Sequence, residues 1–429
     1  MTDEWSLDNL PSDVLLLIFG YCHAFDLVRL SEVCRRFNDL IAEDILWFER
    51  RAKPLATNQA SKRFRDRCNT ILCLRTRWHV SENWQRGKYA EKILHSWEMN
   101  TMPWIYLTKE TLWWSGGNQL CAFRRRCNRY SRPHEPWDET DKIFNRNNIN
   151  SDISKFVVRN QYVISGHRDG HITFWSKSTK QDTHSDLHIQ NAHTSNINAI
   201  DEISGTIISG SANGTVKLWS QPLENVPNFP LATIDVLDRV WSLSADRDAG
   251  KVAVGSSGHH SIPPLKIFDL ECCSESILIR HRWRRGAGIY DMLWENSNIL
   301  LTCGYDTCVR KWDTRTGSCV ATWSDPTDAA LYCLSSDYRF TIVTGTQYNC
   351  KAVLWDQRMT KYVQLFFLTN VGRKSSPLYS ISFDSSSFYG ATDRRLIELT
   401  FSGYDYCEND YKKFLCSQIP QTDTVNGIR

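Results

Sequence analysis

An internal repeat runs through the last three-quarters of this 429-residue chain and limits its possible folds more than any other feature. Seven times between residues 112 and 401, an apolar run ends in a small residue and a glycine, and a polar turn then leads into a second apolar run. The repeated glycines are Gly117, Gly166, Gly210, Gly255, Gly304, Gly345 and Gly390. They lie 49, 44, 45, 49, 41 and 45 residues apart, so one structural unit recurs along the chain.

Each unit is predicted to consist of short β-strands. About 20 residues before most of the glycines lies another short run that is rich in β-branched and aromatic residues, as at 197–200, 240–243 and 290–293. Gly, Asn, Asp and Ser turns separate these runs, and apolar residues keep no helical period in this region. Four short strands in a repeat of this length predict a seven-bladed all-β propeller, because stacked blades bury the faces that a single blade would expose.

The third unit carries the clearest resemblance to a known repeat. Residues 209–219, with Ala192-His193 upstream, resemble the WD repeat almost throughout. Residues 312–313 and 355–356 are the Trp-Asp dipeptide that is typical of its end. Units one, four and seven lack this dipeptide and depart from the family pattern there. The resemblance implies a WD-repeat propeller.

The first fifty residues differ from the repeat and predict three short helices. Ser12 can begin the first helix, with Asp13 in its first turn and apolar residues at helical spacing after it. Asp26 can cap a second helix, and Trp47 falls in a last short one. So much apolar surface cannot be buried internally within about 50 residues, which indicates that part of it meets a partner.

The order of residues in this segment is similar to the F-box along its whole length. The residues that carry the resemblance are Leu10, Pro11, Val14, Leu15, Ile18, Phe19, Leu27, Leu30, Val33, Cys34, Phe37 and Trp47. The resemblance implies a three-helix F-box over residues 1–52, whose residues bind a Skp-type adaptor and, through it, a cullin scaffold. An unrelated helical cap packed on the propeller is the alternative.

A basic connector joins the two units and is expected to span 53–85. Residues 50–78 hold nine Lys or Arg against one acidic residue, and apolar residues at 64, 71, 72 and 74 indicate a helical connector with one apolar side. In F-box/WD-repeat proteins such a connector is rigid and fixes the distance between the substrate and the ubiquitin donor. A basic segment could instead contact RNA or membrane lipid, but a solvated face is the more common use of such charges, so neither is expected.

Closure of the propeller should involve a strand from its N-terminal side, because an open ring would expose an unpaired strand edge. Residues 83–97 resemble the strand that completes the last blade in F-box relatives, so residues near 88–97 are expected to pair with 395–401. The propeller would then span 86–402, and 403–429 would form a peripheral tail.

The resemblance extends from residue 7 to about residue 402 and is strongest to one branch of the family. An Asn-Trp-x-x-Gly element at 83–87 and Met-Pro-Trp at 102–104 make the chain most similar to the dactylin branch of F-box/WD-repeat proteins. Membership implies the substrate-recognition subunit of a Skp–cullin–F-box ubiquitin ligase, which marks a protein substrate for degradation and has no active site. A WD-repeat scaffold or peptide reader that does not lead to ubiquitination is the alternative.

Basic loops indicate where a substrate would bind. In a propeller, the loops that enter each blade share one face with the turns after the repeated glycines. The residues expected on that face are Arg168, Arg239, Arg282, Trp283, Arg284, Arg285, Arg373, Lys374, Arg394 and Arg395. Arginine suits phosphate or carboxylate and tryptophan is an amphipathic anchor, so we expect an acidic or phosphorylated peptide. Ordinary solvated loop charges are the alternative.

Catalytic motifs give no support to an enzyme. No G-x-S-x-G, P-loop, H-E-x-x-H or dinucleotide fingerprint occurs in a fitting context. Asp169, Asp306, His193 and Ser209 resemble a nucleophilic triad only by residue type, because they occupy positions where WD repeats use such residues to link turns and strands.

Cysteine spacing and charge exclude several further classes of protein. The fifteen cysteines include no C-x-x-C, so neither a metal nor another cofactor is expected. Their odd number and an acidic N-terminus without a signal peptide predict reduced thiols in the cytosol or nucleus. The net charge of +3 gives no argument for nucleic acid or membrane binding by the whole chain.

Overall fold

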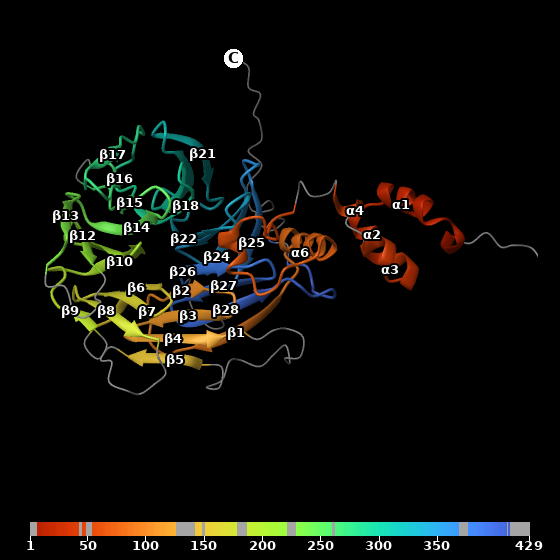
Figure 1. Cartoon of the computed structure of the whole chain (residues 1–429), viewed down its shortest axis with the longest axis horizontal. Helices are drawn as coiled ribbons and strands as arrows, with labels where there is room; N and C mark the ends of the chain where they lie inside the picture. Colours follow the sequence, from red (N-terminus) through yellow and green to blue (C-terminus); the bar gives the residue numbers. More distant parts are fainter. Residues whose placement is uncertain are drawn as a thin grey trace, which may run out of the picture.

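The computed structural model of the chain describes residues 7–42, 45–48, 54–125, 142–147, 151–177, 187–220, 229–259, 262–368, 376–409 and 411. They form a ring of seven four-stranded sheets with a group of short helices beside it (Figure 1). Helix α6 (Leu74–Arg86) lies between the two units. The predicted fold class, a small helical region followed by a seven-bladed propeller, is confirmed.

Each sheet is one blade, whose four strands follow one another from the innermost outward. Blade one consists of β2 (Trp104–Leu107), β3 (Thr111–Gly116), β4 (Gln119–Arg124) and β5 (Lys142–Asn147). Blade two consists of β6 (Ile153–Val158), β7 (Tyr162–His167), β8 (Ile172–Ser176) and β9 (Leu187–Ile189). Blade three consists of β10 (Ile197–Ile203), β11 (Thr206–Ser211), β12 (Thr215–Ser220) and β13 (Ala232–Asp235). Blade four consists of β14 (Val240–Asp246), β15 (Lys251–Ser256), β16 (Leu265–Asp269) and β17 (Glu275–Ile277). Blade five consists of β18 (Ile289–Asn296), β19 (Ile299–Gly304), β20 (Cys308–Asp313) and β21 (Ser318–Ser324). Blade six consists of β22 (Leu331–Ser336), β23 (Thr341–Thr346), β24 (Lys351–Asp356) and β25 (Tyr362–Phe367). Blade seven consists of β26 (Leu378–Phe383), β27 (Ser387–Thr392), β28 (Arg395–Thr400) and, outermost, β1 (Ala90–Ser96).

The ring closes in the last blade, as predicted. Strand β1 pairs antiparallel with β28, from Ala90 opposite Thr400 to Ser96 opposite Arg395. This pairing ties the N-terminal side of the propeller to its C-terminal end, so the last blade is completed by a strand from the other end of the propeller.

Two of the repeated glycines, Gly166 and Gly210, lie where neighbouring blades approach each other. A Cβ added to Gly166 would come within 2.5 Å of Cγ2 of Ile197, which begins the innermost strand of the next blade. A Cβ on Gly210 would come within 2.6 Å of Cγ1 of Val240 in the same relation. Real Cβ atoms do not approach other atoms so closely, so blade-to-blade packing explains the glycine at these two positions.

The N-terminal region has four short α-helices rather than three. After η1 (Leu7–Asn9) come α1 (Ser12–Tyr21), α2 (Ala24–Leu30), α3 (Arg35–Ala42) and α4 (Ile45–Phe48). Helix α2 begins two residues before Asp26, which therefore lies in the first turn and does not cap the helix. The chain turns after Leu30, where the Ser31 hydroxyl donates to the Val28 carbonyl at 2.5 Å, so α2 and α3 are separate helices.

Only part of the connector is helical. Besides α6, it contains the single turn α5 (Lys62–Arg65), and the described chain around α5 is irregular and packs on the propeller. Phe64 is buried in the propeller core, whereas Ile71 is 65% exposed and takes no part in the predicted apolar side. The connector is held by contacts with the propeller and not by one continuous helix.

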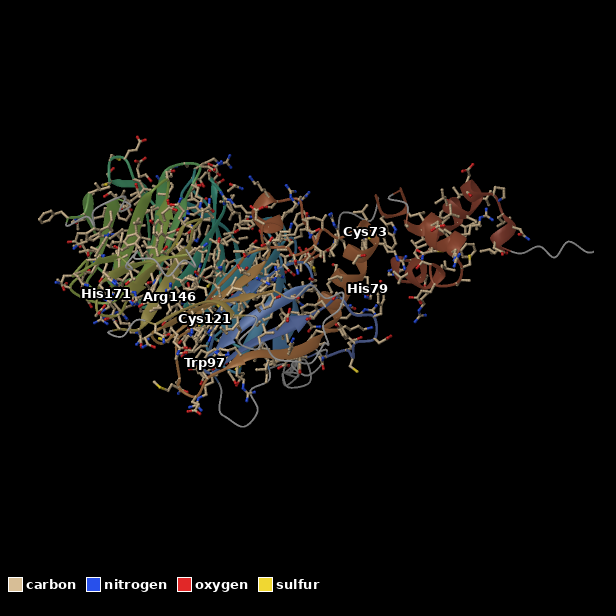
Figure 2. All side chains as sticks on the ribbon, turned by 60° about the horizontal axis from the view of Figure 1, so that its bottom comes forward. Cys73, His79, Trp97, Cys121, Arg146 and His171 are labelled. Carbon is tan, nitrogen blue, oxygen red and sulfur yellow. The ribbon has the colours of Figure 1, made fainter. Side chains whose placement is uncertain are left out.

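Helix α6 belongs to two hydrophobic cores. Leu74 and Trp78, at its beginning, pack against the core of the N-terminal helices. Val80 and Trp84, further along, are buried in the core of the last propeller blades. His79 lies between these pairs, and its label in Figure 2 marks the junction of the two units. One rigid element therefore fixes the helices relative to the propeller.

The beginning of the predicted tail is not peripheral. The Asn83 side-chain amide donates to the carbonyls of Phe401 (2.7 Å) and Gly403 (2.9 Å), and His79 stacks on Tyr404 at 4.3 Å between ring centroids. Helix α6 ends at Gly87, whose φ of +67° is the left-handed conformation that favours glycine after a helix. Residues 83–86 are thus helical, and the closing strand begins only at Ala90.

Candidate functional site

The expected adaptor-binding residues divide into a buried core and an exposed surface. Five of them form the core of the helical region: Leu15, Phe19, Leu27, Phe37 and Trp47. Leu10, Ile18, Leu30 and Cys34 are partly buried around that core, whereas Pro11, Val14 and Val33 are exposed. Only the exposed and partly exposed residues can contact a partner while the helices remain folded.

An exposed apolar stripe on α1 contains two residues that the sequence interpretation missed. Leu17 is 65% exposed and Tyr21 is 88% exposed, and both continue the line that begins at Val14. The spacing of three and then four residues places all three side chains on one helical face. The same spacing is visible in the sequence, but it cannot by itself distinguish an exposed apolar face of a helix from a buried one.

The Leu10-Pro11 turn before α1 is held from α3. The Arg36 guanidinium donates to the carbonyl of Asp8 and, at 2.5 Å, to the carbonyl of Leu10. Trp47, on α4, donates from Nε1 to the Ile41 carbonyl at 2.7 Å. The Arg36 bonds fix the Leu10-Pro11 turn beside the exposed stripe, and the Trp47 bond ties α4 to the end of α3.

The described arginines of the expected substrate face lie on loops of one propeller face. Arg168 and Arg394 occupy turns between the second and third strands of their blades, and Arg395 begins β28. Arg239 lies in the loop before β14, and Arg282, Arg284 and Arg285 lie in the loop before β18. The arginines before β14 and β18 are exposed on neighbouring loops. Arg373 and Lys374 fall outside the described residues.

Trp283, the expected amphipathic anchor, is held against the propeller. Its ring is half-buried and stacks on Trp312 with 5.3 Å between centroids, and the Arg310 guanidinium lies 5.7 Å from its centroid. Trp283 thus packs on the outer part of blade five, and the exposed arginines around it are left as the candidates for ligand contact in this loop.

The mouth of the central channel is a site that the sequence interpretation missed. In six of the seven innermost strands, a β-bulge near the first residue leaves one residue out of register with the next strand. These bulge residues are Ser154, Asn198, Trp241, Tyr290, Tyr332 and Tyr379. All six line a cavity of about 360 Å³ on the face that carries the loops described above. Bulges turn side chains away from the regular alternation, which is how they reach the mouth.

Aromatic rings cover one wall of this mouth. Trp241 stacks on Tyr290 with 4.8 Å between centroids, and Tyr290 lies 4.6 Å from Tyr332. Tyr305 packs beside Tyr290 at 5.0 Å, and Tyr379 lies 6.1 Å from Tyr332. Burial raises the pKa of the Tyr290 and Tyr332 hydroxyls, so both remain protonated hydrogen-bond donors at neutral pH.

A buried ion pair crosses the channel below the mouth. The Lys155 ammonium, on β6 of blade two, lies 3.7 Å from Oδ1 of Asp291, which is on β18 across the channel in blade five. The same ammonium lies 4.0 Å from the centroid of the Trp104 ring. Burial raises the pKa of Asp291, and the nearby Lys155 opposes that rise. Lys155 therefore forms part of the floor of the mouth.

The connector covers the other end of the channel. A second cavity, of about 460 Å³, is lined by the innermost strands and by Arg63, Asp66 and Arg67 of the connector. Arg63 Nη1 donates to the Trp294 carbonyl at 3.2 Å, and Arg67 Nη1 donates to the Ser335 hydroxyl at 3.0 Å. A ligand of the channel can therefore approach most directly from the face opposite the connector.

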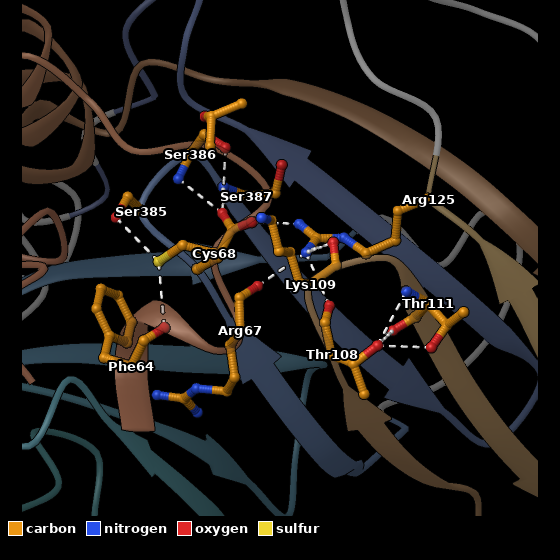
Figure 3. A network of polar contacts seen from close by, with 12 residues as sticks. Phe64, Arg67, Cys68, Thr108, Lys109, Thr111, Arg125, Ser385, Ser386 and Ser387 are labelled. Carbon is orange, nitrogen blue, oxygen red and sulfur yellow. Dashed lines mark hydrogen bonds and ion pairs between the residues drawn. The ribbon is translucent and has the colours of Figure 1, made fainter. Parts of the chain in front are cut away.

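A polar network fastens the connector to the propeller (Figure 3). Arg125 Nη1 donates to the carbonyls of Arg67 (2.8 Å) and Thr108 (3.0 Å), and its other terminal nitrogen pairs with Asp384. The Cys68 thiol lies 3.5 Å from the Ser385 hydroxyl. Five of the basic connector residues, Arg63, Arg65, Arg67, Arg75 and Arg77, donate hydrogen bonds within the chain. They fix the connector, which favours a structural role over nucleic acid binding.

The residues that resembled a nucleophilic triad are separate structural contacts. His193 Nε2 lies 2.8 Å from the Ser209 hydroxyl, which also accepts a hydrogen bond from Trp219 Nε1 at 2.9 Å. Asp169 pairs with His171, and Asp306 pairs with Arg310. Within the described ranges, no group of three or more His, Cys, Asp or Glu side chains could hold a metal ion.

Acid should destabilise the protein through His193. Burial lowers its pKa to about 4 from the usual 6.5, and the nearby Lys217 acts in the same direction. The unfolded chain therefore binds a proton that the folded chain does not between these two values. The contribution of neutral His193 to the free energy of unfolding is therefore fully present above pH 6.5. It decreases as the pH falls toward 4, by about 1.4 kcal/mol per pH unit. Burial also lowers the pKa of His167, to about 3, so urea unfolding at several pH values should show a slope at least as steep as this. His193→Gln should make the slope shallower; an equal slope in both proteins would contradict the assignment.

None of the helices in the described parts of the chain is both long enough and apolar enough to cross a membrane.

Comparisons with known proteins agree with this architecture. The F-box-like family matches residues 7–52, and the WD domain, G-beta repeat family matches residues 185–220. The chain is 32% identical to the F-box/WD repeat-containing protein 4 of Mus musculus over 405 residues, which is 92% of this chain and 93% of the relative. It is equally similar, at 32% over 401 residues, to the protein of that description from Homo sapiens. The WD40 propeller domain of Doa1 superposes with a TM-score of 0.55 at 11% identity, over 72% of this chain and 96% of that one, and supports the fold alone.

Proposed function

The chain belongs to the F-box/WD-repeat family, in the branch of F-box/WD repeat-containing protein 4, and from this premise we propose that it is the substrate-recognition subunit of a Skp–cullin–F-box ubiquitin ligase. F-box domains bind Skp1 adaptors, and WD40 propellers bind protein partners. In this proposal, residues 1–52 bind the adaptor, which reaches a cullin, and the propeller over 86–402 binds a protein that is then ubiquitinated.

The observation that carries the proposal is the exposed apolar stripe of Val14, Leu17 and Tyr21 on the helical region. Such a surface on a small unit is a binding surface by its physical chemistry, since exposed apolar side chains gain free energy when a partner covers them. Helix α6 and the polar network then hold the propeller at a fixed position relative to that partner. Fixed geometry is what a receptor contributes, because it raises the effective concentration of the substrate at the ubiquitin donor.

We assign substrate contact to the propeller face with the channel mouth. Arg282, Arg284 and Arg285 are exposed there and would contact acidic or phosphorylated groups, with Arg168, Arg239, Arg394 and Arg395 as further basic residues of that face. The propeller itself supplies no chemistry in this scheme.

Affinity purification of the full chain, followed by mass spectrometry and a ubiquitin-chain assay, tests the proposal. The adaptor and the cullin should co-purify with the normal chain, and the purified complex should form ubiquitin chains when the activating and conjugating enzymes are added. A Leu10→Ala, Pro11→Ala variant should lose both proteins and the activity. Recovery of the adaptor without the cullin, or of both without activity, would favour the alternative of a WD-repeat scaffold that does not lead to ubiquitination.

A further inference from the structure

We propose that the channel mouth is an anchor pocket that takes one large apolar side chain, preferably aromatic, from an extended peptide whose neighbouring residue is acidic. The inference deepens the proposed function, because it names the chemistry of the substrate segment at the propeller. It differs from recognition by the arginine loops alone, since the central contact is apolar and the acidic contact lies beside it.

The aromatic wall supplies the apolar part of the site. Trp241, Tyr290, Tyr332 and Tyr379 come from four successive blades, and each is only partly buried. Tyr305, in the turn between β19 and β20, packs beside them and is 39% exposed. Tyrosine and tryptophan offer large, rigid contact areas at a small entropic cost and, together with arginine, are enriched at binding hot spots. An unbroken row of them at the mouth of a cavity therefore favours an apolar side chain lying against the rings.

The opposite wall supplies hydrogen-bond donors and positive charge. Lys155, the exposed Arg168 and the side-chain amides of Asn196 and Asn198 all line the cavity, and the Asn198 amide also donates to the Val240 carbonyl at 2.8 Å. The charge of Lys155 is partly balanced by Asp291, and Arg168 lies 4.0 Å from Asp152, at the outer limit of an ion pair. A carboxylate beside the anchor residue would meet Arg168 and the amides without leaving water completely.

The lining of the mouth argues against a cationic ligand. Aromatic rings attract cations, but none of the described residues that line this cavity carries a carboxylate, whereas two carry a positive charge. A lysine or arginine side chain that entered the cavity would lose hydration and would be repelled by the like charge of Lys155. The volume of about 360 Å³ suits a single side chain and its neighbours rather than a helix or a folded surface.

A displayed library of random short peptides, panned on the full chain bound to its adaptor, tests the inference without a known substrate. We expect the enriched peptides to share an aromatic or large aliphatic residue next to Asp or Glu. An enriched peptide, labelled and measured by fluorescence anisotropy, should bind Tyr332→Ala and Tyr290→Ala at least about tenfold more weakly. Arg168→Gln should remove the preference for the acidic neighbour and weaken the dependence of affinity on salt.

Matched variants separate the mouth from the rest of the face. Tyr348 is 51% exposed on a turn of the same face and does not line the mouth, so Tyr348→Ala should change affinity by less than about twofold. Enrichment of basic peptides, no enrichment at all, or a larger loss in the Arg282→Ala, Arg284→Ala, Arg285→Ala triple variant than in the tyrosine variants would overturn the inference. The adaptor and cullin should co-purify equally with every one of these variants, so a failure of the anchor pocket remains distinct from a failure of the ligase assignment.

Discussion

Trp84→Ala should lower the free energy of unfolding of the propeller by about 4 kcal/mol, although Trp84 lies on the connector helix and outside the repeat. The Trp84 side chain is fully buried in the core of the last blades. Its ring stacks on Phe401 at 3.8 Å and meets Phe383 edge-on at 5.7 Å, and Nε1 donates to the Ser385 carbonyl at 3.1 Å. Truncation would leave a large cavity and an unpaired buried carbonyl at the blade that closes the ring. Urea unfolding followed by tryptophan fluorescence and circular dichroism measures the change.

The control for Trp84 comes from the same connector. Ile71 is 65% exposed, so Ile71→Ala should change the free energy of unfolding by less than about 0.5 kcal/mol. If Trp84→Ala left the unfolding midpoint unchanged, helix α6 would not belong to the propeller core, and the fixed position of the F-box would lose its explanation.

The architecture followed from the sequence because the repeat has a direct physical cause. Gly166 and Gly210 recur where the next blade comes too close for a side chain, so their spacing reports the blade itself. The pairing of β1 with β28 could also be predicted, since a closed ring needs a strand to seal its last edge.

Local departures from the prediction arise from tertiary contacts. Neither the break after Leu30 nor the exposure of Ile71 follows from helical periodicity, which describes one element at a time. Residues 403–429 are expected from the sequence to form a peripheral tail, yet the Asn83 amide of α6 donates to the Gly403 carbonyl, and the Asn409 N–H donates to the Gly87 carbonyl. Their partners lie more than 300 residues earlier in the chain, and no local pattern reveals such a pairing.

The candidate sites were only partly visible in the sequence for the same reason. Trp283 stands among four basic residues and reads as an amphipathic anchor for a ligand, but its ring stacks on Trp312 of blade five. Tyr290 and Tyr332 read as ordinary strand residues, and only the bulges turn them to the channel mouth. Bulge positions depend on how two strands pair, so alternation along a single strand does not disclose them.

A Val14→Glu, Leu17→Glu variant should bind the Skp-type adaptor at least about 100-fold more weakly while its helices stay folded. Both side chains are exposed on α1, at 40% and 65%, so their replacement removes no core contact. Glutamate is a good helix former, and α1 should therefore persist. An adaptor surface that covers this stripe would have to bury two unpaired carboxylates, which costs more than the apolar contacts that are lost. Calorimetric titration with the purified adaptor measures the affinity, and circular dichroism measures the helices.

Two further variants separate lost contact from lost structure. Phe19→Ala removes a fully buried ring from the helical core and should weaken adaptor binding only together with unfolding of the helices. Met99 is 76% exposed on the propeller side of the chain, so Met99→Glu places one such carboxylate on an exposed apolar side chain away from the helices and should leave adaptor affinity unchanged. If the Val14 and Leu17 variant bound the adaptor as the normal chain does, the partner would have to use another part of the helical region. The partly buried residues around Leu10 and Cys34 would then be the remaining surface, and the exposed stripe would need a different partner.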